Sequence, residues 1–88
     1  MMKILKREVP TDTRLFALSL PHRARIVHVE MDQSGTPSLW IAGDPTAVME
    51  DRNFMTVPTG QEFDIGTNDL FVGSFVIATK AWHLFELR

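Results

Sequence analysis

Apolar and polar residues alternate with a period of two along residues 25–32. The apolar positions are Val27, Val29 and Met31, and the polar positions between them are His28 and Glu30. Such alternation is typical of a half-buried strand. Turn-forming residues occupy 33–37, and residues 38–42 return to an apolar, aromatic run. The pattern therefore predicts a β-hairpin made of 25–32 and 38–42.

Two short runs at residues 3–9 and 13–20 precede this hairpin. Pro10-Thr11-Asp12 separates them, and both runs predict strands, which we expect to pair with each other. Residues 44–49 follow the hairpin and begin with Asp-Pro-Thr. An aspartate can accept backbone N–H bonds and a proline suits the first position of a helix, so this segment predicts either a turn or one helical turn.

The second half of the chain contains three further runs that favour strands. Residues 53–57 carry β-favouring side chains and end at Pro58, which predicts a strand. A loop with several turn formers follows at 59–69, and long ordered loops often carry binding function. Residues 70–78 and 81–87 are strongly apolar and separated by a short connection, which predicts a second hairpin.

These elements predict six or seven strands in a chain with almost no helical periodicity. We therefore expect an all-β fold, a small antiparallel β-sandwich or barrel with at most one short helical turn. Residues 71–78 are apolar on both faces, which predicts a central strand covered by a second sheet or by another subunit. The expected core residues are Phe16, Leu18, Val27, Val29, Leu39, Ile41, Phe54, Val57, Phe75, Ile77 and Phe85.

Composition places the chain among ordinary globular domains. Its 88 residues suffice for a single hydrophobic core, so we expect one all-β domain over 1–88. Apolar residues make up 44% and charged residues 23%, which predicts a folded chain. The chain has no cysteine, so a fold this small must be stabilised by packing or by self-association. Together with the apolar strand, this predicts a homo-oligomer.

Charge disfavours one class of partner. Nine Lys and Arg face eleven Asp and Glu, so no overall positive field can hold a nucleic-acid backbone, and nucleic-acid binding is not expected. Residues 1–7 contain too few apolar side chains for a signal peptide or a membrane span. We therefore expect a soluble, unprocessed, cytoplasmic protein with no membrane partner.

Motifs for catalysis are missing from the sequence. No serine lies in a Gly-x-Ser-x-Gly turn, no loop has the glycine spacing and lysine of a phosphate-binding loop, and the three histidines lack zinc-site spacing. We expect His28 and His83 to hydrogen-bond to neighbours, and we expect no catalytic residue, metal ion or cofactor. The chain is thus not expected to be an enzyme. The enzymatic alternative is a hydrolase that uses acids of the 59–69 loop, such as Glu62 and Asp64.

Basic and aromatic residues are the candidates for binding. The segment His22-Arg23-Ala24-Arg25, with Arg14 and Arg52, can gather positive charge at one end of the sheet. Guanidinium groups bind carboxylates and phosphates through paired hydrogen bonds, which favours an anionic ligand or an acidic partner surface. Trp40 and Trp82 can anchor a core or a subunit interface, or stack on a base. The candidate residues for binding a ligand or partner are Arg23, Arg25, Arg52, Trp40 and Trp82.

Several short motifs together resemble a family of small uncharacterised proteins encoded mainly by bacteriophages. These motifs are Leu20-Pro21-x-x-Ala24-x-Ile26-x-x-Val29, Leu39-Trp40, Asp44-Pro45, Thr59-Gly60, Gly73-Ser74-Phe75 and Trp82-His83-Leu84-Phe85-Glu86. They span nearly the full length of the chain, although the Asp44-Pro45 segment departs from the more Pro-rich, acidic form of the family. The resemblance implies a virus-encoded accessory protein that works in the cytoplasm of a bacterial host, and it carries over no catalytic residue.

Size, the missing catalytic motifs and the resemblance lead to one expected function. We expect a non-enzymatic protein that interferes with a host process by occupying one of its components, such as a host defence protein or a nucleotide signal. It would do so by masking a host protein or by sequestering a small anionic ligand between subunits. The alternative is a structural or assembly protein of a virion or oligomeric complex, with residues 70–78 as the contact surface.

Overall fold

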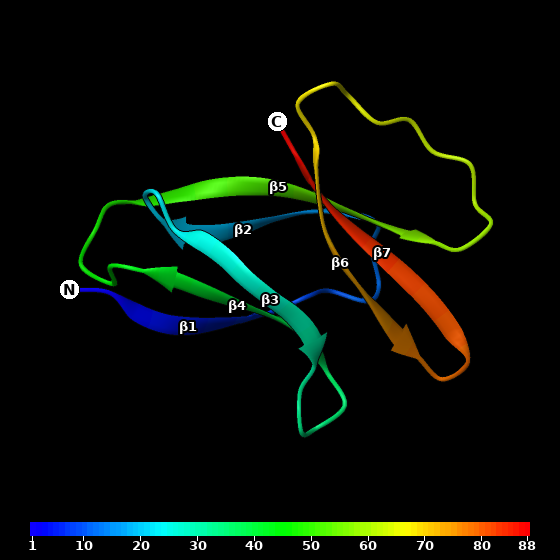
Figure 1. Cartoon of the computed structure of the whole chain (residues 1–88), viewed down its shortest axis with the longest axis horizontal. Coiled ribbons are helices and arrows are strands. Elements are labelled where there is room, and N and C mark those ends of the chain that lie inside the picture. The colour runs from blue at the N-terminus through cyan, green and yellow to red at the C-terminus, as the bar shows by residue number, and fades with distance from the viewer.

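The computed structural model describes all 88 residues as seven strands joined by turns and loops, with no helix (Figure 1). The strands are β1 (Lys3–Glu8), β2 (Leu15–Pro21), β3 (Arg25–Met31), β4 (Pro37–Gly43), β5 (Met49–Pro58), β6 (Leu70–Ile77) and β7 (Lys80–Leu87). Every pairing between them is antiparallel. The predicted all-β class is confirmed. No helix of the chain is long and apolar enough to cross a bilayer.

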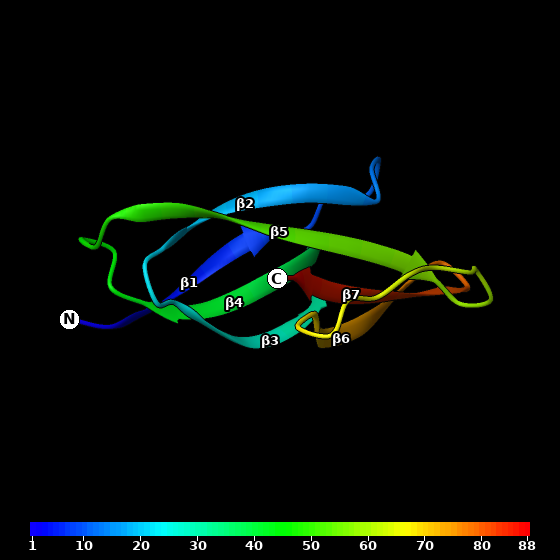
Figure 2. The same cartoon turned by 90° about the horizontal axis from the view of Figure 1, so that it is seen from above.

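The strands form two sheets, with the orders β1-β4-β3 and β2-β5-β7-β6. Neither sheet closes into a barrel. They lie against each other in a sandwich-like arrangement, which Figure 2 shows from its thin side, and the molecule measures 40 × 33 × 19 Å. One core joins both sheets, and its buried members are Val9, Leu20, Ala24, Val29, Leu39, Ile41, Phe54, Phe75 and Leu84.

Most of the expected core residues lie in or against this core, but Val27 does not. The register between β3 and β4 shifts between Ile26 and His28, which is a β-bulge. Val27 therefore has no partner on β4 and is 53% exposed, while Ile26 packs against the core in its place. The prediction for Val27 was wrong because simple alternation cannot reveal an inserted residue. Phe85 is half-buried and contacts Phe63 and Phe71 outside the core cluster.

The two predicted hairpins are confirmed, since β3 pairs with β4 and β6 pairs with β7. The predicted pairing of the first two strands is wrong. β1 pairs with β4 and β2 pairs with β5, so residues 9–14 carry the chain from one sheet to the other. Both partners are distant in sequence, and a local pattern contains no information on such pairings.

The expectation that residues 71–78 form a central strand is also wrong, because β6 lies at the edge of its sheet. Its neighbour in the other sheet is the edge strand β3, which lies beside it in both views (Figures 1 and 2). Gly73 allows this approach, since a Cβ atom there would lie 2.2 Å from Cγ1 of Val29. The opposite face of β6 is open, and Phe71 on it is 60% exposed.

Residues 44–47 form a turn and not a helical turn. The carboxylate of Asp44 accepts hydrogen bonds from the backbone N–H of Thr46 at 2.9 Å and from its hydroxyl at 2.7 Å. The backbone N–H of Ala47 donates to the carbonyl of Asp44 at 3.0 Å. These bonds close the connection between β4 and β5, so the turn alternative is the observed one.

Candidate functional site

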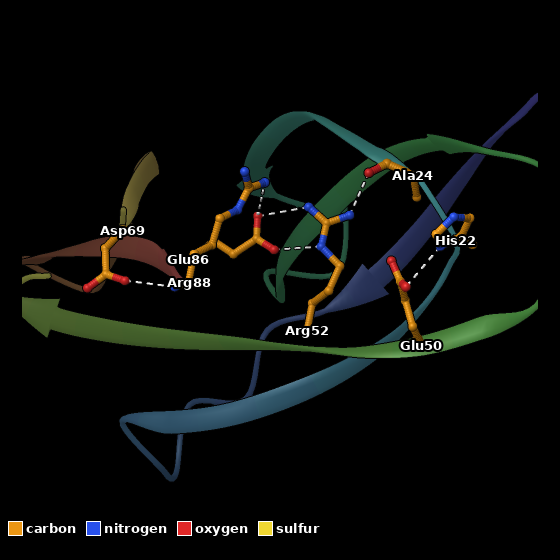
Figure 3. Close-up of polar contacts among 7 residues, drawn as sticks. All are labelled: His22, Ala24, Glu50, Arg52, Asp69, Glu86 and Arg88. Carbon is orange, nitrogen blue, oxygen red and sulfur yellow. Dashed lines mark hydrogen bonds and ion pairs between the residues drawn. The ribbon is translucent and has the colours of Figure 1, made fainter. Parts of the chain in front are cut away.

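Arg52 of β5 and Glu86 of β7 form an ion pair at the centre of a basic region (Figure 3). The Nε atom of Arg52 donates to Oε2 of Glu86 at 2.6 Å, and Nη2 donates to Oε1 at 2.8 Å. Two parallel bonds of this kind are the strongest geometry for an arginine and a carboxylate. Glu86 is only 4% exposed, so the pair is held inside the fold.

Two further contacts complete the environment of this pair. Nη1 of Arg52 donates to the carbonyl of Ala24, which ties β5 to the start of β3. Nη2 of Arg88 donates to Oε1 of Glu86 at 3.2 Å. No buried side-chain nitrogen or oxygen atom of the protein lacks a partner, so the pair is fully satisfied.

The protonation of the pair follows from these contacts. Burial raises the pKa of Glu86, but the hydrogen bonds and charges of Arg52 and Arg88 outweigh it, so the pKa lies below its ordinary value. The hydrogen bond to Glu86 raises the pKa of Arg52. Both groups are therefore ionised at neutral pH, and much of the charge of Arg52 is neutralised within the protein.

A hollow of about 270 Å³ lies on one side of this pair and is lined by β3, β6 and the chain end. Three guanidinium groups and one carboxylate line it, so positive charge exceeds negative charge by two. Arg25 is exposed, and its guanidinium group forms no hydrogen bond or ion pair with the rest of the chain. The apolar side of the hollow consists of Ala24, Ile26, Leu70, Phe71 and Val72.

A second hollow of about 430 Å³ lies on the other side of the pair and contains Arg23. Its acids, Glu50, Asp51 and Glu86, equal its three arginines in number, so it has no excess of positive charge. Nδ1 of His22 contacts Oε2 of Glu50 at 3.0 Å, and this hydrogen bond lowers the pKa of Glu50. The hollow is therefore a weaker anion site than its neighbour.

The two tryptophans lie away from this basic region. Trp40 is on the outer face of the β1-β4-β3 sheet, opposite Lys6 and His28 in the register, and its ring centroid is 5.9 Å from that of His28. Trp82 lines a separate hollow of about 200 Å³ together with Arg14. Arg52 thus lines both hollows, whereas Arg25 lines only the first and Arg23 only the second, and neither tryptophan lines either of them.

Sequence reasoning missed Glu86 and Arg88. A signal for Glu86 exists, because it continues the inward-facing row of β7 formed by Trp82 and Leu84. A carboxylate in such a row requires a buried cation as its partner. No comparable signal exists for Arg88, since it is the last residue and follows the end of β7.

His28 and His83 form hydrogen bonds with neighbouring side chains, in agreement with the prediction for both residues. Nε2 of His28 contacts Glu30 at 3.1 Å, whereas His83 lies 2.7 Å from the hydroxyl of Ser74 and 2.7 Å from that of Thr59. No carboxylate contacts His83, so these three residues do not form a triad with an acid. No group of three or more His, Cys, Asp or Glu side chains is arranged to hold a metal ion.

Comparison with known proteins gives one match. The family model described as Domain of unknown function (DUF7352) matches residues 1–88. No curated protein and no solved structure matches the chain. Because the family model covers every residue of the sequence, the chain belongs to the DUF7352 family.

Proposed function

We propose that this protein is a non-enzymatic binding protein that sequesters a small anionic ligand in the hollow between β3 and β6. The observation that carries the proposal is the excess of positive charge there, next to an apolar wall. Arg25 is free to bind a ligand, whereas Arg52 is already paired with Glu86. A free guanidinium group beside such a wall suits a carboxylate or phosphate attached to a flat apolar group.

The residues of the hollow have distinct roles in this proposal. Arg25 and Arg88 supply the charge-assisted hydrogen bonds, each contributing about 1.5–3 kcal/mol. Phe71 supplies exposed aromatic surface for the apolar part of the ligand. Arg52 acts as a positioning residue, since its bond to the Ala24 carbonyl orders the chain just before Arg25. A nucleotide has both a phosphate and a flat base, so it is the ligand class that we favour.

The biological role that we propose is interference with a host process in the cytoplasm. It is supported by the motifs that resemble small bacteriophage proteins, and by a site that offers binding groups without a catalytic set. Sequestration acts by mass action, so the protein would lower the free concentration of its ligand without consuming it. Alternatively, the same arginines would interfere with the host process by masking an acidic surface on a host protein.

Thermal unfolding with added nucleoside monophosphates tests the proposal. A bound nucleotide raises the melting temperature of the wild-type protein, and Arg25→Gln and Phe71→Ser each remove most of that increase. Lys80→Gln is the control, because it removes one positive charge from the start of β7, away from the hollow. Failure of all nucleotides to raise the melting temperature would overturn the ligand class. An equal increase in Arg25→Gln and in the wild type would overturn the site.

A structural or assembly protein is the second candidate function, and one observation favours it. Large apolar side chains are exposed on the outer face of the β2-β5-β7-β6 sheet and on the adjoining loop. They are Leu15, Phe63, Ile65, Phe71 and Val76. Exposed apolar side chains on one sheet are typical of a contact surface. Purified virions or host complexes that contain the chain would support this candidate over ligand sequestration.

A further inference from the structure

The two sheets have four edge strands, and only one of them is neither packed against another edge nor charged in its own sequence. β3 and β6 lie against each other, where Gly73 packs on Val29. β1 carries four charged residues among its six, which is a common protection of an edge against pairing. β2 has the sequence LFALSLP and no charge. Its unpaired side carries no charge of its own; Arg7 of β1 bonds to the Ser19 carbonyl there, and Pro21 lacks an N–H at the end of the strand.

β2 is also regular. Its register with β5 is unbroken from the pair Leu15 and Met55 to the pair Pro21 and Met49. β3 and β6 both contain a register shift, which bends a strand and hinders pairing with a further one. An uncharged edge strand with an unbroken register accepts another strand readily.

We propose that β2 is the interface of a homodimer, in which it pairs antiparallel with β2 of a second copy across a twofold axis at Ala17. The two four-stranded sheets then become one continuous sheet. An antiparallel strand pair of this kind is isologous, because the same residues contribute from both copies. This inference stands apart from the ligand site, which lies at β3 and β6.

The backbone of β2 presents the hydrogen-bonding groups that this pairing needs. The N–H of Thr56 donates to the carbonyl of Arg14 at 2.9 Å, and the N–H of His22 donates to that of Val48 at 2.8 Å. By alternation, the backbone N–H and C=O groups of the even-numbered residues of β2 bond to β5. Those of the odd-numbered residues point to the open edge. Ala17 then pairs with itself across the axis, and Leu15 pairs with Ser19 of the second copy.

Two carbonyls on the open edge already accept one side-chain bond each. Thr13 donates to the carbonyl of Leu15 at 3.0 Å, and Arg7 donates to that of Ser19 at 3.3 Å. A carbonyl oxygen has two lone pairs, so each can accept a second bond. The N–H and C=O groups of Ala17 lie between these two positions and have no side-chain partner.

Side chains fit the same register. Phe16 and Leu18 point toward the core but are only half-buried, because no strand lies beyond β2. With Ala17 on the axis, Phe16 lies opposite Leu18 of the second copy, and two such contacts cover the open side of the core. On the outer face, Leu15, which is 63% exposed, lies opposite Ser19 of the second copy.

The charges that flank β2 are the reason to assign the second strand to another copy of this chain. Asp12 and Arg14 precede the strand, and His22 and Arg23 follow it. The register that places Ala17 on the axis brings Asp12 toward His22 and Arg23 of the second copy, twice per dimer. Asp12 and Arg23 form no ion pair within one chain. In this register Asp12 of each copy faces positive charge on the other and Arg14 lies opposite Leu20, so the charge match between the copies comes from Asp12.

Sedimentation velocity over micromolar to submillimolar concentrations tests the proposal. The wild-type protein is expected to reach twice the 10.0 kDa of one chain. Ala17→Lys places two lysines opposite each other at the axis and keeps the chain at the monomer mass. Ala17→Thr is the matched control, since threonine favours strands, carries no charge and leaves the dimer intact. Circular dichroism confirms that each variant is folded.

Hydrogen exchange gives a second measurement on the folded protein. The amide of Ala17 exchanges slowly in the wild-type dimer and faster in Ala17→Lys, whereas amides of β4 exchange equally in both. A wild-type protein that remains monomeric over the whole concentration range overturns the proposal. So does an Ala17→Lys variant that dimerises as tightly as the wild type, because the interface then lies elsewhere.

Discussion

Glu86 is the only acidic residue buried in this fold, and its surroundings explain why it is tolerated. Arg52 bonds to both carboxylate oxygens, and Arg88 bonds to one of them. The same arrangement limits what Arg52 can do for a ligand, since its guanidinium group is already occupied. The neighbouring Arg25 therefore becomes the main candidate for direct contact with an anion.

Replacing Glu86 is expected to destabilise the protein strongly. Glu86→Gln leaves the guanidinium group of Arg52 without a countercharge, which costs about 3–5 kcal/mol in the free energy of unfolding. Arg88→Gln removes only the single 3.2 Å contact of a half-exposed side chain and is expected to cost less than about 1 kcal/mol. Urea unfolding of the two variants measures both values. Equal stability of the two variants would contradict the buried-pair interpretation.

At the scale of the elements, the close contact between β3 and β6 depends on a residue without a side chain. Gly73 lies so close to Val29 that an added methyl group would overlap its Cγ1 atom. The two sheets therefore meet along this side, and the hollow lined by Arg25 and Phe71 lies between the same two strands. The two strands that pack through Gly73 and Val29 therefore also line the candidate ligand site.

Gly73→Ala is expected to lower the free energy of unfolding by about 1–3 kcal/mol, because Val29 or the backbone of β6 must shift. Val29→Ala removes the overlapping methyl groups but leaves a cavity of its own. In the double variant the overlap is gone, so its loss of stability is smaller than the sum of the single losses. A double-mutant cycle by chemical denaturation measures this coupling. Strictly additive losses would show that Gly73 does not mediate the contact.

Across the whole molecule, buried or hydrogen-bonded carboxylates tie distant segments together. Asp32 closes the turn between β3 and β4 by accepting bonds from Ser34 and Thr36, and it also accepts one from Lys6 of β1. Asp69 connects the end of the 59–69 loop to the last residue of the chain, because it accepts the backbone N–H of Arg88 at 2.7 Å. These carboxylates accept their bonds in the ionised form.

Acid is therefore expected to destabilise the fold. The bonds from Ser34 and Lys6 lower the pKa of Asp32, and those from the N–H groups of Arg88 and Gly66 lower the pKa of Asp69. A carboxyl group with a lowered pKa in the folded state stabilises the protein fully above its unfolded pKa. That contribution is lost as the pH falls through the folded pKa. The free energy of unfolding thus falls as the pH is lowered from about 5 to about 2.

Urea unfolding at a series of pH values tests this expectation, and Asp32→Asn should flatten the dependence because the variant cannot lose a proton. The stability of Asp32→Asn is lower than that of the wild type at neutral pH and approaches it in acid. A wild-type stability that does not change over this range would contradict the assigned carboxylate contacts.

Part of the candidate site could be predicted from residue types and spacing. Arg23 and Arg25 are neighbours in the sequence, so their proximity needed no tertiary information. Arg52 lies near them only because the fold brings β5 close to the start of β3, where its Nη1 atom donates to the carbonyl of Ala24. Trp40 and Trp82 carry the same kind of sequence signal, but they lie in different sheets and line different surfaces.

Alternation and turn residues were sufficient to locate the strands and the two hairpins, because side-chain direction and tight turns depend on neighbours in the chain. They missed the start of β5, which begins at Met49 and not at residue 53. They were not sufficient to identify the partners of β1 and β2, the edge position of β6 or the bulge at Val27. Those features depend on which backbone edges and side chains meet when two sheets pack, and the contacting residues are far apart in sequence. The pairing of Arg52 with Glu86 is of the same kind, since only the finished fold brings a buried acid and its countercharge into contact.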